Sequence, residues 1–320
     1  QLKSNFRKCW DVFDRDKFSS EYIGFTVAPI LNSDGRVSDA LGSVNFLSAD
    51  DENIIEQKFK VLKEQNQQRK DIQKQITSQA LVRARELDDK FNSLCILLDD
   101  GHAGVHGISA SRIKDTFGKP VIIFSQTESD EHIISGSVRS VDEIHIKDVL
   151  DSVNAKNNGL IIRYGGHKGA AGLTLKKSDF DVFYKAFEQE VCDVMQKDSV
   201  ELGPRMYFDF SLDEKDFSFK SLEMINSLEP FGREFEKPLF CNDFDVENIR
   251  FVGKDKNHAQ LMLRTGNKSI KSIWFNAIDN PISADITIGD VIKVCYELQK
   301  EEFMGNVNIS LNIRAVQKQC

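Results

Sequence analysis

The sequence contains one long stretch without glycine or proline, from Asp51 to Phe91, and this stretch restricts the fold most. Its apolar side chains recur at steps of three and four residues, at Ile55, Phe59, Leu62, Ile72 and Ile76. This period predicts a mostly solvent-exposed helix, about 60 Å long at 1.5 Å per residue. The stripe has a polar gap around Asn66 and no strict heptad, so a connecting rod between domains is favoured over a coiled coil.

The segments before and after this helix differ in the secondary structure that their sequences predict. Residues 93–200 alternate strand-like runs with amphipathic helices, which predicts an α/β domain with a mainly parallel sheet. After Val200 short strands dominate, and they predict a small closed barrel of the oligonucleotide/oligosaccharide-binding (OB) type. One of these predicted strands is 206–210. Residues 1–50 have too little apolar surface to fold alone and are expected to end a domain that begins earlier.

Composition restricts the function classes only broadly. The chain has 320 residues, a net charge of −8 and no apolar run of membrane-spanning length. This charge gives no general attraction to nucleic acid, so any such binding needs a local site. The six cysteines are scattered without paired spacing, which predicts reduced thiols in a cytoplasmic protein and neither a zinc site nor a disulfide framework.

A glycine-histidine stretch, 165–173, follows the apolar run 160–164, which predicts a buried strand leading into a turn. Gly165 and Gly166 would turn the backbone tightly and expose it to a ligand. His167 on such a turn can donate to a phosphate, bind a metal or carry a proton. The alternative is an ordinary turn with a loop histidine.

A second candidate is the run 135–140, Ser-Gly-Ser-Val-Arg-Ser, predicted to follow the end of a strand. Backbone N–H groups, the Ser137 and Ser140 hydroxyls and the Arg139 fork would suit a phosphate. The alternative is a common loop with a surface arginine.

Metal sites are weakly indicated. His102 and His106 are four residues apart, but the three glycines around them argue against a helix and so against a zinc pair. His102 is therefore expected to line a site, and His106 to be incidental. The acidic pairs, such as Asp99-Asp100, are expected to be solvated turns.

Several motifs in one order carry a family resemblance. They are Ala-Pro-Ile-Leu-Asn-Ser-Asp-Gly-Arg at 28–36, Asn66 with Arg69, His-Ala-Gly-Val-His-Gly-Ile-Ser-Ala-Ser-Arg at 102–112, 135–140, 165–172, and Glu-Pro-Phe-Gly at 229–232 with Pro-Leu-Phe at 238–240. Together they resemble the RecJ family of single-strand-specific 5′→3′ DNA exonucleases in the DHH phosphoesterase superfamily. The chain departs from the family at Ile30 (usually arginine), at Gly101 (usually tryptophan) and at Ser33-Asp34 (usually two alanines).

The resemblance implies a domain order. Residues 1–50 would end the DHH domain, 51–91 would form the connecting helix, 92–200 the DHH-associated α/β domain, and 201–320 an OB-fold-like barrel. The full-length enzyme would use Mn²⁺ or Mg²⁺, held by residues that precede Gln1. No metal ligand and no cofactor are expected in this chain, which would be inactive alone.

The resemblance also implies the site. His167 would be catalytic. Phosphate and DNA contacts would come from Asn32, Arg36, His102, Arg112, Ser137, Arg139, Ser140, Gly165, Gly166 and Trp274. In the barrel, bases would stack on Trp274, Phe251 or Phe303, although core packing is an equal alternative for each.

The implied partners are single-stranded DNA and, in the cell, single-strand-binding protein and a helicase, with no membrane. Two other functions stay open: a phosphodiesterase of the same superfamily acting on very short RNA or cyclic dinucleotides, and a non-catalytic single-strand-binding module. The first usually lacks a barrel.

Overall fold

The computed structural model describes residues 8–14, 19–37, 40–232, 234–303 and 305–318. The chain divides into two units, 1–204 and 205–320. No helix in the described ranges is long and apolar enough to cross a membrane.

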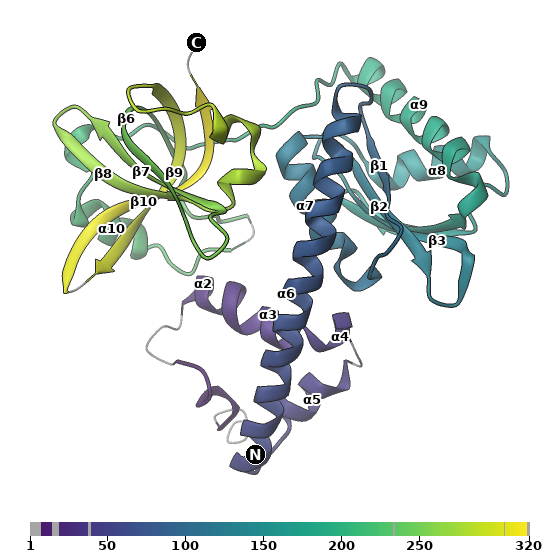
Figure 1. Ribbon diagram of the computed structural model, residues 1–320, viewed down its shortest axis with the longest axis horizontal. Coiled ribbons are helices and arrows are strands. Elements are labelled where there is room, and N and C mark those ends of the chain that lie inside the picture. Colours follow the sequence, from purple (N-terminus) through teal and green to yellow (C-terminus); the bar gives the residue numbers. More distant parts are fainter. Residues whose placement is uncertain (1–7, 15–18, 38–39, 233, 304, 319–320) are drawn as a thin grey trace. The chain divides into compact units, whose positions relative to one another are not determined.

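The first unit begins with short helices and continues through one long helix into a sheet (Figure 1). Its helices are α2 (Ser20–Tyr22), α3 (Ala28–Leu31), α4 (Asp34–Val37), α5 (Leu41–Leu47), α6 (Glu52–Asp88), α7 (Ala103–Phe117), α8 (Ile146–Lys156) and α9 (Phe180–Asp198). Its strands are β1 (Leu94–Leu97), β2 (Val121–Thr127), β3 (Asp130–Arg139), β4 (Arg163–His167) and β5 (Ala170–Lys176). A π-helical turn, Ile23–Val27, lies between α2 and α3.

The long helix α6 confirms the prediction from the glycine-free stretch. It has 37 residues, so it is about 55 Å long. The Asp51 carboxylate caps it by accepting from the N–H groups of Asn53 and Ile54. Its apolar stripe serves two cores: Ile55 and Leu62 pack with the N-terminal helices, whereas Ile76 and Leu81 pack under the sheet. The polar gap around Asn66 is therefore the place where α6 passes from one core to the other.

The sheet has the order β1-β2-β3-β5-β4, and the prediction of a mainly parallel sheet is wrong. Only β1 and β2 pair in parallel, whereas β2–β3, β3–β5 and β4–β5 are antiparallel. The reason is local: two-residue turns join β2 to β3 and β4 to β5, and such short connections require antiparallel neighbours. The helical crossover predicted for a parallel pair is present only between β1 and β2, as α7.

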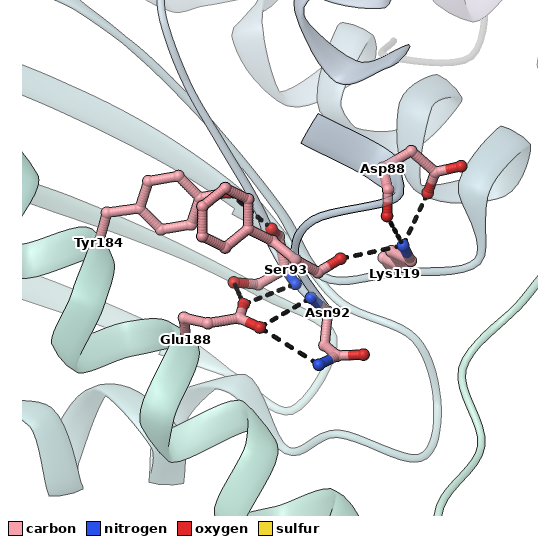
Figure 2. A network of polar contacts seen from close by, with 7 residues as sticks. Asp88, Asn92, Ser93, Lys119, Tyr184 and Glu188 are labelled. Carbon is pink, nitrogen blue, oxygen red and sulfur yellow. Dashed lines mark hydrogen bonds and ion pairs between the residues drawn. The ribbon is translucent and has the colours of Figure 1, made fainter. Parts of the chain in front are cut away.

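A polar network fixes the junction between α6 and β1 (Figure 2). The Glu188 carboxylate of α9 accepts from the backbone N–H groups of Asn92 at 2.8 Å and Ser93 at 2.9 Å. The Tyr184 hydroxyl donates to the Ser93 carbonyl oxygen at 2.9 Å. Lys119 forms an ion pair with Asp88 at 2.7 Å at the end of α6. One helix thus satisfies the backbone at the entrance to the sheet.

The second unit is a closed barrel of five strands in the order β10-β8-β7-β6-β9. Its elements are α10 (Phe219–Asn226), β6 (Phe240–Val252), β7 (His258–Thr265), β8 (Lys268–Trp274), β9 (Val291–Phe303) and β10 (Asn306–Lys318). Only the β8–β10 pair is parallel. The barrel prediction is confirmed, but the strand predicted at 206–210 is absent except for one isolated bridge between Phe210 and Phe240.

Candidate nucleic-acid interface

The β3-β5-β4 half of the sheet leaves one face uncovered, apart from the part of β3 that α7 contacts. Helices α8 and α9 pack on the opposite face, against Ile134 and Val138 of β3 and Leu173 and Leu175 of β5. On the open side α6 and α7 form a core with β1 and β2, and among the buried residues that the structure describes this core includes none from β4 or β5. Polar side chains can therefore occupy this part of the sheet.

Three ladder rows cross the open face. They are Arg139–Ala170–His167, Ser137–Gly172–Gly165 and Ser135–Thr174–Arg163. Residues opposite one another in a ladder share a face, as do alternate residues along a strand. The open face therefore combines two arginines, a histidine and three hydroxyls around a centre without side chains.

That centre is a hollow of about 400 Å³, lined in part by Ser137, Gly165 and Gly172. A Cβ added at Gly165 meets no atom within 4 Å, and one added at Gly172 meets only the Gly136 carbonyl oxygen at 3.9 Å. Packing therefore does not require glycine at either position. Gly165 and Gly172 instead keep the sheet backbone open to an approaching ligand.

Two local predictions at this site are wrong. Gly165 and Gly166 do not form a turn but lie in the edge strand β4, and the turn is formed by Lys168 and Gly169. Gly166 also has a packing role, since its Cβ would lie 2.3 Å from the Ala170 carbonyl oxygen. The run 135–140 is likewise no loop: through Arg139 it belongs to β3, which pairs with β2 and β5 on both sides. Its backbone N–H groups serve the sheet, so only its side chains are left for a phosphate.

Three arginines meet beside the first ladder row. The Arg36 guanidinium donates to the Gly104 carbonyl oxygen at 2.9 Å, in the first turn of α7. Arg139 reaches the same helix: its Nη2 lies 2.4 Å from the point where a Cβ on Gly107 would stand. Glycine at 107 thus makes room for the guanidinium.

The third member, Arg69, lies in the polar gap of α6, where it donates to the Asn66 and Gln73 side chains at 3.2 and 3.0 Å. Burial, and then the charge of Arg36, lower the pKa of Arg69 and of Arg139. Among the ion pairs of the described residues, none joins Arg36, Arg69 or Arg139 to a carboxylate. Partly desolvated like charges without counter-charge favour an anion between them. We call these three residues the arginine cluster.

Asp34, next to this cluster in sequence, is buried. Its carboxylate is 3% exposed and accepts from the Ser43 N–H at 3.1 Å and the Gln65 amide at 2.9 Å. It therefore ties α4 to α5 and α6. Ile30, where the family usually has arginine, is buried in the N-terminal core.

The two histidines of α7 differ from expectation. The helix begins at Ala103 despite its glycines, with His102 at the N-cap. His106 is completely buried, and both of its ring nitrogens lack a hydrogen-bond partner among the described residues. Burial, together with the nearby His102, lowers the pKa of His106 to about 4. His106 is therefore neutral at pH 7, and its protonation is disfavoured in the fold.

This burial predicts a stability loss in mild acid. The folded state binds the His106 proton only near pH 4, whereas the unfolded chain binds it near the ordinary value of 6.5. The contribution is complete above pH 6.5 and falls as the pH drops toward 4, by about 2 kcal/mol between pH 7.5 and pH 5. Urea unfolding of the wild type and of His106→Leu at both pH values measures it, because the variant lacks this part of the pH dependence. His132→Gln, with a side chain 85% exposed, is the control. An unchanged pH dependence in His106→Leu would contradict the assignment.

Two predicted site residues do not join the site. The Ser140 side chain is buried and donates to the Ile144 carbonyl oxygen at 2.8 Å, so its hydroxyl is already used. Trp274 is 5% exposed in the barrel core, so its ring is not available to stack on a base. Phe251 is 38% exposed on β6. The Phe303 side chain lies outside the described residues.

The other predicted residues keep their roles as predictions. Asn32 is exposed at the end of α3, next to the arginine cluster in sequence. Arg112 is half-buried on α7, and burial lowers its pKa. His167 is exposed at the end of β4, where its Nδ1 accepts from the Gly169 N–H at 3.3 Å. The sequence analysis did not include Arg69, Arg163 and Thr174 among the site residues. Arg163 and Thr174 are identified by the strand register. Arg69 could have been noticed because it lies in the polar gap of α6.

The comparisons with known proteins agree with this architecture. Residues 91–193 match the DHHA1 domain family, and residues 208–315 match the RecJ OB domain family. The single-stranded-DNA-specific exonuclease RecJ of Haemophilus influenzae is 32% identical over 302 residues, which are 92% of this chain and 52% of that protein. The chain belongs to the RecJ family. RecJ of Escherichia coli is 29% identical over 311 residues, 94% of this chain and 52% of that protein. The chain thus spans about half the length of these curated relatives.

A solved RecJ structure has the same fold. RecJ of Thermus thermophilus in complex with Mg²⁺ matches 98% of this chain and 46% of its own, with a TM-score of 0.76 and 22% identity. Its complex with Mn²⁺ matches equally well, with a TM-score of 0.76 and 21% identity. The likeness therefore extends over nearly the whole of this chain.

Proposed function

We propose that the full-length protein is a RecJ-type exonuclease, which hydrolyses single-stranded DNA from its 5′ end. In this proposal the present chain holds the strand across the open face of the sheet. The observation that supports it best is the arginine cluster, where cations without carboxylate partners adjoin a bare patch of sheet. The relatives named above are single-stranded-DNA-specific exonucleases, and a phosphate-rich polymer suits both features.

Each part of the site has a role in this proposal. Arg36, Arg69 and Arg139 neutralise the 5′-terminal phosphate, and Arg139 offers a bidentate fork to it. The Ser137 and Thr174 hydroxyls and Arg163 hold the following phosphates, while Gly165 and Gly172 let the strand approach the backbone. His167 ends the row that Arg139 begins, so it is placed to contact a phosphate near the scissile bond.

We do not assign the divalent metal of the proposed reaction to residues of this chain. In the described ranges, no group of three or more histidine, cysteine, aspartate or glutamate side chains could hold a metal ion. The solved Thermus thermophilus complexes contain Mg²⁺ or Mn²⁺. We keep such an ion as a proposal for the full-length enzyme and assign to this chain only the binding and positioning of DNA.

The barrel distinguishes this proposal from a small-nucleotide phosphodiesterase. A closed five-strand barrel of OB topology suits a single strand longer than a dinucleotide. Its described surface carries exposed aromatic rings, including Phe251, on which bases can stack. We also propose that a helicase and single-strand-binding protein supply the substrate, since an enzyme of this specificity needs an opened duplex.

The test of the proposal is binding of the chain to a single-stranded oligonucleotide with a 5′ phosphate or a 5′ hydroxyl, at two salt concentrations. We expect tighter binding of the phosphorylated end, with affinity falling as salt rises. Equal affinity for the two ends would remove terminal phosphate recognition from this chain. Cleavage by the full-length protein tests the reaction itself, and degradation of duplex DNA as fast as of single strands would overturn the substrate class.

Filling the hollow separates binding from folding. A valine at position 165 projects into space where a Cβ meets no atom within 4 Å, and a β-branched residue suits a strand. We expect Gly165→Val to keep the unfolding midpoint and to weaken DNA binding by about tenfold, ~1.4 kcal/mol. Gly24→Val, at another glycine with open space around its Cβ, is the control. Unchanged affinity in Gly165→Val would show that the strand does not cross the hollow.

A further inference from the structure

Two cysteines that are distant in sequence meet on neighbouring strands of the barrel. Cys241 of β6 and Cys295 of β9 are direct partners in an antiparallel ladder. The Cys295 thiol donates to the Cys241 sulfur at 3.0 Å. Both are free thiols, and they are 4% and 8% exposed. Nothing in the spacing of the six cysteines indicates this pair.

The backbone at this place suits a covalent link. Directly opposed residues of an antiparallel ladder have Cα atoms about 4.5–5.5 Å apart, within the range of about 4.4–6.8 Å seen for disulfides. The two thiols also share one face of the barrel, because ladder partners point to the same side. A bond between the sulfurs therefore needs side-chain rotation but no movement of the strands.

The pair lies on the outer side of the barrel wall. Its chain neighbours Phe240, Val294 and Tyr296 point inward and belong to the barrel core, and neither cysteine is part of that core. Side chains alternate along a strand, so the thiols point outward. An oxidant therefore does not have to enter the barrel core to reach them.

We propose that Cys241 and Cys295 are a modification site, which a peroxide or a low-molecular-weight disulfide converts reversibly into a cross-strand disulfide. With hydrogen peroxide, one thiol sulfur takes an oxygen to give a sulfenic acid and one water. The second thiol then displaces the hydroxyl group, forming the S–S bond and a second water. Two thiols and one peroxide thus give one disulfide and two waters.

The disulfide would join β6 to β9 at the place where residues 210–212 bind to the barrel. The Cys241 N–H donates to the Phe210 carbonyl oxygen at 3.3 Å, and the Ser211 hydroxyl donates to the Cys241 carbonyl oxygen at 2.7 Å. The next residue, Asn242, receives the Leu212 N–H at 3.0 Å and the Tyr296 hydroxyl at 2.6 Å. Joining β6 to β9 therefore holds the strands on which residues 210–212 are docked.

The reaction is expected to be slow at neutral pH. Burial, and then the neighbouring Cys241 thiol, raise the pKa of Cys295 to about 12, and the thiolate is the reactive form. The folded protein is therefore treated with excess hydrogen peroxide for hours, alkylated, digested and measured by mass spectrometry. We expect a 241–295 cross-linked peptide pair, about 2 Da lighter than the reduced pair, which dithiothreitol reverses.

Controls separate this site from general oxidation. Buried Cys95 has no cysteine partner among the described residues and should stay alkylatable after mild reduction, without a cross-link. The yield of the 241–295 link should not change with protein concentration, because the reaction is intramolecular. The unfolding midpoint of the barrel should rise on oxidation and return after reduction.

The wild-type measurement is decisive even if a variant fails to fold. Cys295→Ser should abolish the cross-link and the shift of the unfolding midpoint together. Sulfinic acid at either cysteine without a 241–295 link would overturn the proposal. Both thiols remaining free while the more exposed Cys192 is oxidised would overturn it as well.

Discussion

Replacing Arg139 by alanine is expected to slow cleavage of 5′-phosphorylated single strands by the proposed full-length exonuclease about 100-fold, equivalent to ~2.7 kcal/mol. The physical reason is the position of this guanidinium, which belongs both to the arginine cluster and to the first ladder row of the open face. Its removal takes away a charge that no carboxylate offsets among the described residues, together with the fork that can bind two phosphate oxygens. Substrates with a 5′ hydroxyl should lose much less, because they lack that phosphate.

Two further variants make the Arg139 experiment specific. Arg139→Lys keeps the charge but loses the fork, so it should fall between the wild type and Arg139→Ala. Arg83→Ala removes an arginine of α6 that is 59% exposed and pairs with Glu86, and it should leave the rate unchanged. Unfolding midpoints of all three show whether the fold is retained. An equal loss on phosphorylated and hydroxyl ends would contradict the role of Arg139 in end recognition.

The elements that the sequence predicted well are those determined by local pattern. The long helix needs only a glycine-free stretch with a helical period and a cap at Asp51, and all of these lie within the segment itself. The amphipathic helix α9 follows from the spacing of Phe183, Phe187 and Val191, which are buried in the sheet core. Such features depend on neighbours three or four residues away, so the information that determines them lies within one segment of the sequence.

The features that the sequence missed depend on distant partners. Gly165 and Gly166 have the composition of a turn, but pairing with β5 makes them a strand, and no local signal states that partner. The glycines of α7 suggested a helix break, yet 104 and 107 are the places where Arg36 and Arg139 contact that helix. Base stacking and core packing were equal alternatives for Trp274, and the structure shows it in the barrel core.

The candidate site shows the same division. Its motif residues could be named from the resemblance, whereas the arginine cluster joins residues 36, 69 and 139 from three separate elements. No pattern within one segment predicts that convergence. The polar gap around Asn66 is the single trace of it in the sequence, because an α6 that served one continuous core would have an apolar residue there.

The second large effect is expected from a substitution in the junction network of Figure 2, and it concerns the stability of the fold, not DNA binding. Glu188→Ala removes the acceptor of the Asn92 and Ser93 N–H groups and leaves both without a partner at a site where Ser93 is fully buried. We expect a loss of about 3 kcal/mol in the free energy of unfolding of the first unit, since each unsatisfied buried donor costs about 1–3 kcal/mol. Glu188→Gln keeps one oxygen and should lose less.

Hydrogen exchange measures this effect locally. Amides of β1, which follows the network directly, should exchange faster in Glu188→Ala, whereas amides of the barrel strands should be unaffected because they belong to the other unit. Gln189→Ala changes the exposed neighbour, whose amide donates to Asp193 on the surface of α9, and should stay within about 0.5 kcal/mol of the wild type. Equal protection of β1 in Glu188→Ala and Gln189→Ala would mean that Tyr184 and Lys119 hold the junction without the carboxylate. Faster exchange confined to Glu188→Ala would show that one side chain of α9 fixes the start of the sheet on which the proposed DNA site is built.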